Sequence, residues 1–500
     1  MRQCTLRIID EVSCAFLGLT DDHANMLVNK FALYAEGYFF NPRFKLGMWD
    51  GKVKYFTPAG KTYNYLIDQI LPIIKNCGYT IKLEDKRVNK VVFPDEIDCN
   101  IFNHINHPKT GKPIVLRDDQ VNAVNLLLQE GNGICLAVTS AGKSIIISAL
   151  IQAYAPFNLR TLTIVPDQTL IRQLKADYTM FGFDPGEYSG KEKTPEKQHV
   201  VSTWQALQNN PTIVSGFDIV IVDETHKCKA KVLQELLVKY AAKIPHRFGF
   251  TGTLPKDPNN ERLVYITMGP VRVTITASEL MEIGAIAQLK INIIQLEEDM
   301  KQEYQNYIDN EHSFGPVPTY KQYKDQYFPD FSAEKDYLQR NKTRIQWIAD
   351  FLIKQRDTTG NVMCLVSSIA FGRKLAKLIP GAIFVNGTDM KKVDDRTDTY
   401  DLFDTRNDLI VIATVHVAGT GLSINRIMSM VFVDIGKAFE RTMQAIGRGL
   451  RLSHDKKSII VSDICSDLKY SRDHMRFRVD YYEEAKYKFE KHKINYLKTT

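Results

Sequence analysis

No apolar run in this 500-residue chain approaches the roughly 18 residues that a membrane-spanning helix requires. The opening residues, MRQCTLRIIDEVS, contain no apolar core of a signal peptide. The eight cysteines are scattered without a CxxC pair or a repeated spacing, which argues against a disulfide framework and against a zinc site. We therefore expect a cytoplasmic protein with reduced cysteines and no membrane association.

A strong excess of one charge is also missing, as are the signatures of some enzyme classes. Lys and Arg exceed Asp and Glu by only 65 − 58 = 7, which permits a polyanionic partner without requiring one. The flanking regions show no nuclease or methylase signature such as PD…ExK. The hydrophobic share of 44% and the charged share of 25% are those of a globular protein. The length predicts roughly three to four domains.

The stretch ICLAVTSAGKS (134–144) predicts the centre of an α/β domain. An apolar run suits a buried strand, a turn of small residues follows, and IIISALIQAYA continues as a helix. This order is that of a P-loop, in which Lys143 would reach the terminal phosphates and Ser144 would offer its hydroxyl to Mg²⁺. Ala137 stands where the strict pattern has glycine, so a chance GKS turn is the alternative. The residues predicted to contact the nucleotide are Thr139, Ser140, Ala141, Gly142, Lys143 and Ser144.

A helix predicted from LRDDQVNAVNLLLQEG precedes the P-loop. Arg117 and Gln120 lie near its start and could reach a bound adenine. A Gln amide both donates to and accepts from the adenine edge, which favours ATP over GTP. Without a P-loop nearby, two polar residues at a helix start would be the simpler interpretation.

The segment FDIVIVDETHKC supplies a second chemical motif. Its apolar run predicts a central strand that ends in Asp223, Glu224, Thr225 and His226. At the tip of a strand parallel to the P-loop strand, Asp223 could hold Mg²⁺ through water, and Glu224 could orient or deprotonate the attacking water. His226 is a further catalytic candidate. GKS and DETH together predict a nucleoside triphosphatase.

The order of motifs resembles that of the superfamily 2 helicases from about residue 114 to 465. The matching segments are TSAGKS, IVPDQTL, STWQ, DETH, TGT, MCLVSS (363–368), ATVHVAGTGLSI (413–424) and QAIGRGLR (444–451). The resemblance implies two tandem RecA-like parallel-sheet motor domains, ATP and Mg²⁺ as cofactors, and a nucleic-acid substrate. It also implies nucleic-acid contacts by Thr203, Trp204 and Thr414, and nucleotide contacts by Gly419 and Gly421. Asp119 departs from the family, in which an aromatic residue often precedes the adenine-reading Gln.

Five apolar segments of the second half predict a second parallel sheet. They are VMCLVSS, AIFVNG, DLIVIAT, MVFVDI and IIVSDIC. No second P-loop accompanies them, so we expect one nucleotide shared between two sheets. Arg448 and Arg451 would then stabilise the charge that develops on the departing γ-phosphate. Gln444 would contact the attacking water or the phosphate. An exposed turn is the alternative for this glycine–arginine segment.

Basic and aromatic residues alternate between Tyr38 and Lys61. WDGK predicts a hairpin turn, because Asp-Gly favours type I′ geometry. A basic hairpin with stacking side chains predicts a nucleic-acid surface, whereas the aromatics could instead fill a small α/β core. The candidate DNA contacts are Arg43, Lys45, Trp49, Lys52 and Lys54. The segment EGYFFNPRFKLGMWDGKVKYF resembles the N-terminal domain of the UvsW-type phage helicases, which act on branched DNA.

Four parts are expected along the chain. They are an N-terminal DNA-recognition domain (1–100), a first motor domain (101–283), a second motor domain (284–465) and a C-terminal helical tail (466–500). The Tyr-rich stretch 299–340 is interrupted by GPVP and predicts a two-helix insertion, either a structural arm or a DNA-facing wedge or clamp. We expect the tail to pack on the second motor domain, with DNA contact as the alternative.

The functional expectation is an ATP-dependent DNA helicase that remodels forks, D-loops or four-way junctions in phage recombination, repair and replication. An RNA helicase and the translocase subunit of a restriction system remain open, because the motor motifs are common to all three. DNA, branched, double- or single-stranded, is the expected partner, with replication or recombination proteins as further candidates. A monomer is expected.

Overall fold

The computed structural model describes residues 2–88, 91–108, 110–138, 140–190, 192–311, 316–386, 402–403, 405–415, 426–436 and 458–498. The chain divides into two compact units, Met1–Ile275 and Thr276–Thr500. This division falls eight residues before the expected boundary at 283/284, so α10 (Ala277–Glu282) starts the second unit. No helix among the described residues is long and apolar enough to cross a membrane.

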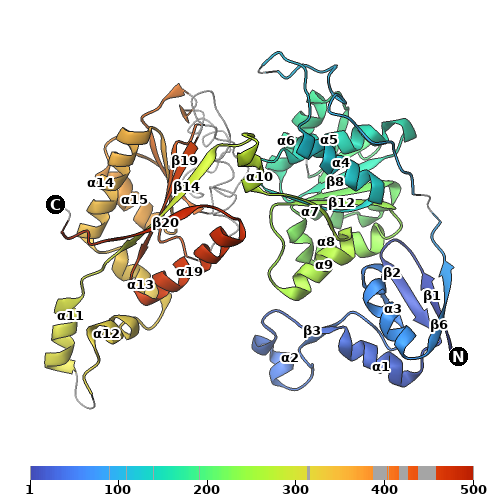
Figure 1. Ribbon diagram of the computed structural model, residues 1–500, viewed down its shortest axis with the longest axis horizontal. Coiled ribbons are helices and arrows are strands. Elements are labelled where there is room, and N and C mark those ends of the chain that lie inside the picture. Colours follow the sequence, from blue (N-terminus) through green and yellow to red (C-terminus); the bar gives the residue numbers. More distant parts are fainter. Residues whose placement is uncertain are drawn as a thin grey trace. The chain divides into compact units, whose positions relative to one another are not determined.

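A four-stranded sheet forms the N-terminal domain (Figure 1). β1 (Arg2–Ile8) pairs antiparallel with β2 (Ser13–Leu17) and parallel with β6 (Tyr79–Asp85), while β5 (Lys61–Tyr63) lies beside β2. Helices α1 (Asp21–Lys30) and α3 (Ile67–Asn76) add Leu27 and Ile70 to its core. The same cluster contains Ile266 of α9 (Pro258–Met268), a helix of the first motor domain. The N-terminal domain and this motor domain therefore share a core.

The basic and aromatic segment forms a hairpin, but WDGK is not its turn. β3 (Ala32–Tyr34) pairs antiparallel with β4 (Lys52–Lys54), and residues 35–51 connect them. This connection holds a 3-10 turn (Tyr38–Phe40) and the short helix α2 (Pro42–Lys45). The Asn41 side chain caps α2 and Pro42 takes its first position, a combination that favours a helix start over a tight hairpin turn.

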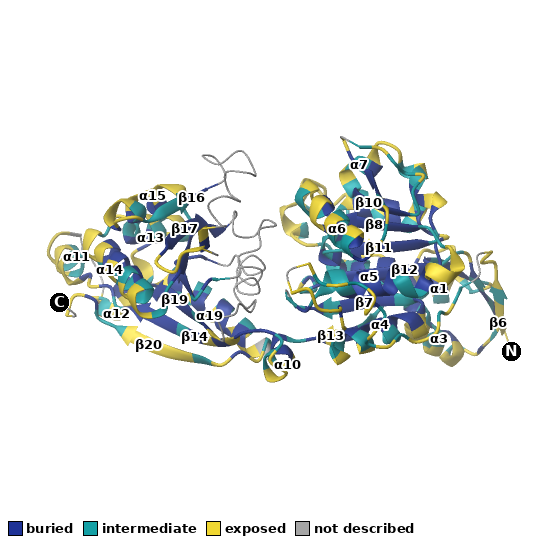
Figure 2. Ribbon diagram, turned by 90° about the horizontal axis from the view of Figure 1, so that it is seen from above, coloured by how far each residue is buried: buried dark blue, intermediate teal, exposed yellow. Residues whose placement is uncertain are grey.

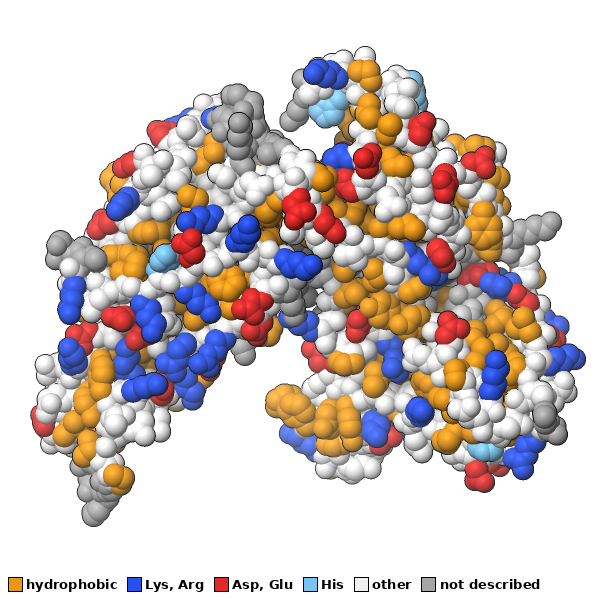
Figure 3. All heavy atoms as spheres, in the orientation of Figure 1, with side chains coloured by type: hydrophobic (Ala, Val, Ile, Leu, Met, Phe, Trp, Pro, Cys, Tyr) orange, Lys and Arg blue, Asp and Glu red, His pale blue; other side chains and the backbone are white. Residues whose placement is uncertain are grey.

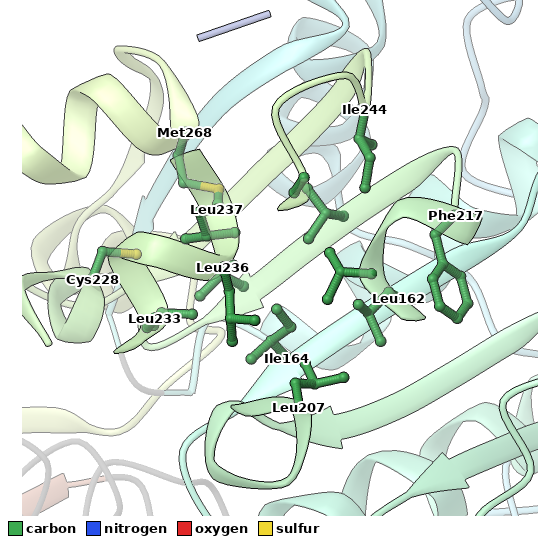
Figure 4. Packing of buried hydrophobic residues seen from close by; sticks show 14 of the residues in the cluster. Leu162, Ile164, Leu207, Phe217, Cys228, Leu233, Leu236, Leu237, Ile244 and Met268 are labelled. Atoms are coloured by element: carbon green, nitrogen blue, oxygen red, sulfur yellow. The ribbon is translucent and has the colours of Figure 1, made fainter. Parts of the chain in front are cut away.

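The first motor domain is a seven-stranded parallel sheet in the order β13-β7-β12-β11-β8-β10-β9. Its strands are β7 (Asn132–Ala137), β8 (Thr161–Val165), β9 (Pro185–Tyr188), β10 (His199–Thr203), β11 (Ile219–Asp223), β12 (His246–Thr251) and β13 (Val271–Ile275). Its helices include α4 (Asp118–Glu130), α5 (Lys143–Tyr154), α6 (Gln168–Met180), α7 (Trp204–Gln208) and α8 (Lys231–Glu235). Figure 2 shows the buried strands between helices whose outer faces are exposed. Branched side chains such as Ile164 and Leu237 interlock on one face of the sheet (Figure 4).

The second unit holds another seven-stranded parallel sheet, in the order β16-β17-β15-β18-β19-β14-β20. The five expected strands are confirmed as β15 (Val362–Val366), β16 (Ile383–Val385), β17 (Ile410–Thr414), β18 (Ser429–Val433) and β19 (Ser458–Ser466). β14 (Gln288–Leu296) and β20 (Phe489–Ile494) complete it, with helices α14 (Lys342–Thr359), α15 (Ile369–Leu378) and α19 (Lys469–Glu484). The α/β fold class with two parallel-sheet domains is thereby confirmed.

The C-terminal tail and the insertion differ from their predicted forms. The tail is helical only through α19, and its last part becomes β20, because β14 offers a free edge to which the strand adds. The described residues of the insertion form the helices α11 (Lys301–Asn306), α12 (Tyr320–Gln326) and α13 (Phe331–Leu338). Tyr323 and Leu338 of the insertion pack in one cluster with Leu468, just before α19. The described part of the insertion therefore packs on its own unit, while its role as a structural arm or as a DNA-facing wedge or clamp stays a prediction.

Candidate nucleotide-binding site

The tips of three neighbouring parallel strands form the candidate site. β7 leads into the P-loop, β11 ends in Asp223, and β12 lies between them and ends in Thr251. Because the strands are parallel, these carboxyl ends meet at one edge of the sheet, where open α/β sheets bind ligands. The P-loop enters α5 through positive φ angles at Ser140 (75°) and Gly142 (86°).

The Lys143 side chain turns back over the loop that carries it. Its ammonium donates to the carbonyl oxygen of Ala137 at 3.2 Å. Ala137 is fully buried at the end of β7, so its carbonyl fixes the position of the charge. The charge of Lys143 also lowers the pKa values of Asp223 and Glu224, opposing their burial. Lys143 therefore brings a positive charge close to both carboxylates.

Arg117 and Gln120 both hold the backbone of the P-loop. The Arg117 guanidinium donates to the carbonyl oxygen of Ala141 at 2.7 Å, and the Gln120 amide donates to the same oxygen at 3.0 Å. The Gln120 carbonyl also accepts from the N–H of Arg117 at 3.1 Å, which closes a capping box on α4. Asp119, a residue whose role the sequence did not reveal, pairs with Arg117 at 2.8 Å. Adenine contact by Arg117 and Gln120 stays a prediction.

The pKa values of the Asp223 and Glu224 carboxyl groups are shifted in opposite directions. Burial, added to the nearby charge of Glu224, raises the pKa of Asp223 above its ordinary value. The pKa of Glu224 is raised by burial but lowered more by the hydrogen bond to His226 and the charge of Lys143, so the net direction is down. Adjacent carboxylates whose pKa values are pushed apart are suited to different roles.

The donor set fits a magnesium ion that arrives with phosphates. Mg²⁺ is usually held by one or two carboxylates together with substrate phosphates and water. Asp223, whose carboxylate accepts only the N–H of Glu224 among the described contacts, would supply the carboxylate, and Ser144 a hydroxyl. Within the described ranges no group of three or more His, Cys, Asp or Glu side chains could cage a metal ion by itself.

His226 connects the DETH segment to the end of β12. Its Nδ1 lies 2.9 Å from the Thr251 hydroxyl and 3.2 Å from the Glu224 carboxylate. Thr225 reaches the same strand, donating to the carbonyls of Val222 and Phe250. A Cβ at Gly249 would lie 2.8 Å from the Thr225 hydroxyl, so this glycine makes room for the contact. The glycine inside the apolar strand RFGFT was the available signal, because such a glycine often marks a close approach.

The candidate DNA contacts of the motor domains lie at strand ends. The Thr203 hydroxyl is buried and caps α7 by accepting the N–H of Ala206, while Trp204 packs against the hydrophobic core of the sheet. Thr414 ends β17 and is buried. Thr203 thus has a structural role that the sequence did not indicate. DNA contact by these residues stays a prediction.

The basic residues of the N-terminal hairpin are distributed around its connection. Arg43 and Lys45 are exposed on α2, and Trp49 donates to the Lys52 carbonyl at 3.0 Å. The Lys52 ammonium lies 4.9 Å from the Tyr34 ring centroid, and Lys54 pairs with Asp50 at 3.2 Å. Trp49 and Lys54 therefore stabilise the hairpin, whereas Arg43 and Lys45 are available to a partner.

Six predicted residues lie outside the described ranges. They are Thr139, Gly419, Gly421, Gln444, Arg448 and Arg451.

Comparisons with known proteins match the chain to helicases and to a restriction-enzyme subunit. The family model "DNA helicase UvsW, N-terminal" matches residues 8–84, and "Type III restriction enzyme, res subunit" matches residues 113–256. The ATP-dependent DNA helicase uvsW of Enterobacteria phage T4 is 27% identical over 451 residues, 86% of this chain and 84% of that protein. The DNA 3'-5' translocase XPB2 of Sulfurisphaera tokodaii is 28% identical over 212 residues, 42% of this chain and 47% of that protein. The crystal structure of T4 UvsW aligns with 99% of this chain and 100% of that chain, at 20% identity and a TM-score of 0.46.

The order of motifs and these sequence matches make the chain similar to the superfamily 2 helicases. Within that class the chain is UvsW-like, in its N-terminal domain as well as in its motor domains.

Proposed function

We propose that this chain is an ATP-dependent DNA helicase that remodels branched DNA, such as forks, D-loops and four-way junctions. The observation that carries the proposal is the convergence of Lys143, Asp223 and Glu224 at one sheet edge of a UvsW-like chain. Lys143 binds the terminal phosphates of ATP, and Glu224, ionised through its low pKa, orients the attacking water. Bound Mg²⁺ would supply positive charge at the phosphates, with Asp223 and Ser144 on its protein side.

The route from ATP hydrolysis to motion begins at His226. Its contacts to Glu224 and Thr251 join the hydrolytic carboxylate to the end of the neighbouring strand. A change at Glu224 on hydrolysis would therefore be felt by the segment that follows Thr251. A role in recombination, repair and replication of phage DNA is part of this proposal, and similarity to an ATP-dependent DNA helicase of a phage supports it.

A second candidate function is the translocase subunit of a restriction system. It is favoured by the match of residues 113–256 to a restriction-enzyme subunit. Such a subunit would need a nuclease from a partner protein. An RNA helicase is the third reading of the same motor.

The Lys143→Ala variant tests the hydrolytic site. Without the ammonium, the negative charge on the terminal phosphates lacks this cation, and loss of one such contact costs on the order of 3 kcal/mol in the transition state. We therefore expect DNA-stimulated ATP hydrolysis to fall at least about a hundredfold. DNA binding should stay within about threefold of the parent, because Lys143 is placed at the nucleotide and not at the DNA. Lys175→Ala is a matched control, because Lys175 pairs with Glu187 and Glu192 away from the strand tips. Retained hydrolysis in the Lys143→Ala protein would overturn the assignment.

A comparison of nucleic acids tests the substrate. ATP hydrolysis is measured with RNA, single-stranded DNA, plain duplex, forked DNA and four-way junctions at several salt concentrations. We expect the forked and four-way DNA to stimulate most, with binding that weakens steeply as salt rises. Stronger stimulation by RNA would favour an RNA helicase, and dependence on an added nuclease partner would favour the restriction translocase.

A further inference from the structure

Four large apolar side chains gather on the surface of the N-terminal hairpin. Phe39, Phe40, Leu46 and Met48 are 52%, 71%, 69% and 70% exposed. We call these four residues the apolar tip. Hydrophobic side chains cover this end of the domain, around α2, on the face shown in Figure 3. A contiguous exposed apolar patch on a globular domain marks a binding surface.

The tip is held in place by a small packed frame. The Tyr38 ring stacks on Tyr34 at 4.5 Å and meets Phe44 edge-on at 4.8 Å. Gly51 closes against both Tyr38 and Phe44, so closely that a Cβ there would lie 2.7 Å from the Tyr38 ring. Because Tyr34, Tyr38 and Phe44 already pack against one another in this frame, the side chains of the apolar tip remain exposed on its outside.

Two cations flank the tip. Arg43 and Lys45 lie on α2 between Phe40 and Leu46, and both are exposed. Neither forms an ion pair with any described residue of the chain. Apolar rings beside unpaired cations match single-stranded nucleic acid, whose bases stack on aromatic side chains while its phosphates bind Lys and Arg.

In an uninterrupted duplex the bases are stacked on one another, so their ring faces are not accessible to apolar side chains. At a branch the strands separate, and the ring faces of the last base pair and of the first unpaired bases become accessible. We infer that the apolar tip stacks on bases at the branch point, while Arg43 and Lys45 hold the adjacent phosphates. This inference rests on the proposed function, because it takes branched DNA as the substrate.

The test uses the full chain carrying Phe40→Ser and Leu46→Ser together. The matched control is Leu83→Ser, which removes a side chain of similar exposure, 65%, from β6 of the same domain. Affinities for a fork and for a plain duplex are measured across a salt series, with fork unwinding alongside. We expect the double variant to bind the fork about tenfold more weakly, as the loss of one base stack predicts, and to unwind it about tenfold more slowly. Its duplex affinity and the salt dependence of binding should stay within twofold of the parent.

A second variant separates bases from phosphates. Arg43→Gln with Lys45→Gln should weaken binding to both DNAs and reduce the slope of log K against log salt by about two. If the double Ser variant loses this slope instead, or binds the fork as Leu83→Ser does, the inference is wrong. It is also wrong if sedimentation shows that the tip joins two copies of the chain and the Ser variant is monomeric.

Folding is checked by the thermal midpoint of each variant. If the double variant is destabilised, Phe40→Ser and Met48→Ser are tested singly, each with an expected loss of at least threefold in fork affinity. Absence of any stimulation of the parent's ATP hydrolysis by DNA would remove the proposed function together with the inference. Normal stimulation with unchanged fork affinity in the variants would remove the inference alone.

Discussion

Gln120 has a structural role that its predicted chemistry does not indicate. The sequence predicts that its amide reads adenine, yet its described bonds go to the Arg117 N–H and the Ala141 carbonyl. A Cβ at Gly142 would lie 2.5 Å from this amide, so Gln120 also occupies the space that the glycine leaves. The Gln120 side chain therefore positions the P-loop. An adenine would have to bind the donor and acceptor positions of the amide that these bonds leave unused.

Gly51→Ala tests the frame of the apolar tip. The new Cβ would lie 2.7 Å from the Tyr38 ring, and the backbone has a φ of +75°. Gly47→Ala is the control, because its φ is +69° but nothing lies within 4 Å of its Cβ. We expect Gly51→Ala to be less stable than Gly47→Ala by about 1–3 kcal/mol, the usual cost of overpacking.

Hydrogen exchange of residues 35–51 measures this difference. Faster exchange in Gly51→Ala than in Gly47→Ala is the expected result. Equal exchange in the two variants would mean that the aromatic frame yields without cost, and the tip would then not be rigid.

At the scale of elements, a buried arginine joins three parts of the second unit. Arg344 of α14 is fully buried and pairs with Glu298, after β14, at 2.9 Å and with Asp434, after β18, at 2.8 Å. Tyr496, beyond β20, donates to the other oxygen of Glu298 at 2.7 Å. The start of α14 and the segments that follow β14, β18 and β20 therefore meet in one polar network.

Arg344→Met should destabilise the second unit by about 3–5 kcal/mol, because it leaves two buried carboxylates without their cation. Arg356→Met on the same helix is the control. Its pair with Asp357 is solvent-exposed, so a loss below about 1 kcal/mol is expected. Urea unfolding measures the free energy of unfolding of each variant, and hydrogen exchange in β14 and β18 shows whether the loss lies in the second unit. Similar losses in the two variants would contradict a structural role for the network.

At the scale of the whole molecule, the N-terminal domain is part of the first unit. Tyr55 donates to the Asn259 side chain at 3.0 Å, and the Tyr65 and Tyr265 rings stack at 5.1 Å. Ile266 of α9 completes the core of the N-terminal domain. Removing the domain would therefore uncover apolar surface on the motor, so truncation alone cannot test the prediction that the domain recognises DNA.

Deletion of residues 2–88 should lower the thermal midpoint of the remaining chain and increase its binding of a hydrophobic dye, because Ile266 and Tyr265 lose their cover. Tyr55→Phe is the control, since it removes one hydrogen bond and keeps the ring packing. An unchanged midpoint after deletion would show that the shared core contributes nothing to the stability of the motor.

The sequence by itself determined the two motor sheets and the reactive motifs. Short apolar runs rich in β-branched residues, such as Ile219–Val222, favour strands when turns bound them, and GKS and DETH take their positions from the strands that precede them. These features depend on neighbours along the chain, so local order was enough to predict them.

Only the tertiary structure decided what those residues touch. The bonds of Arg117 and Gln120 to Ala141, and of His226 to Thr251, join segments that are distant in sequence. The same holds for the exposure of the apolar tip and for β20, which is a strand because the edge of β14 is available. Such contacts follow from how the elements meet in space, and the pattern of neighbouring residues alone does not determine the partners.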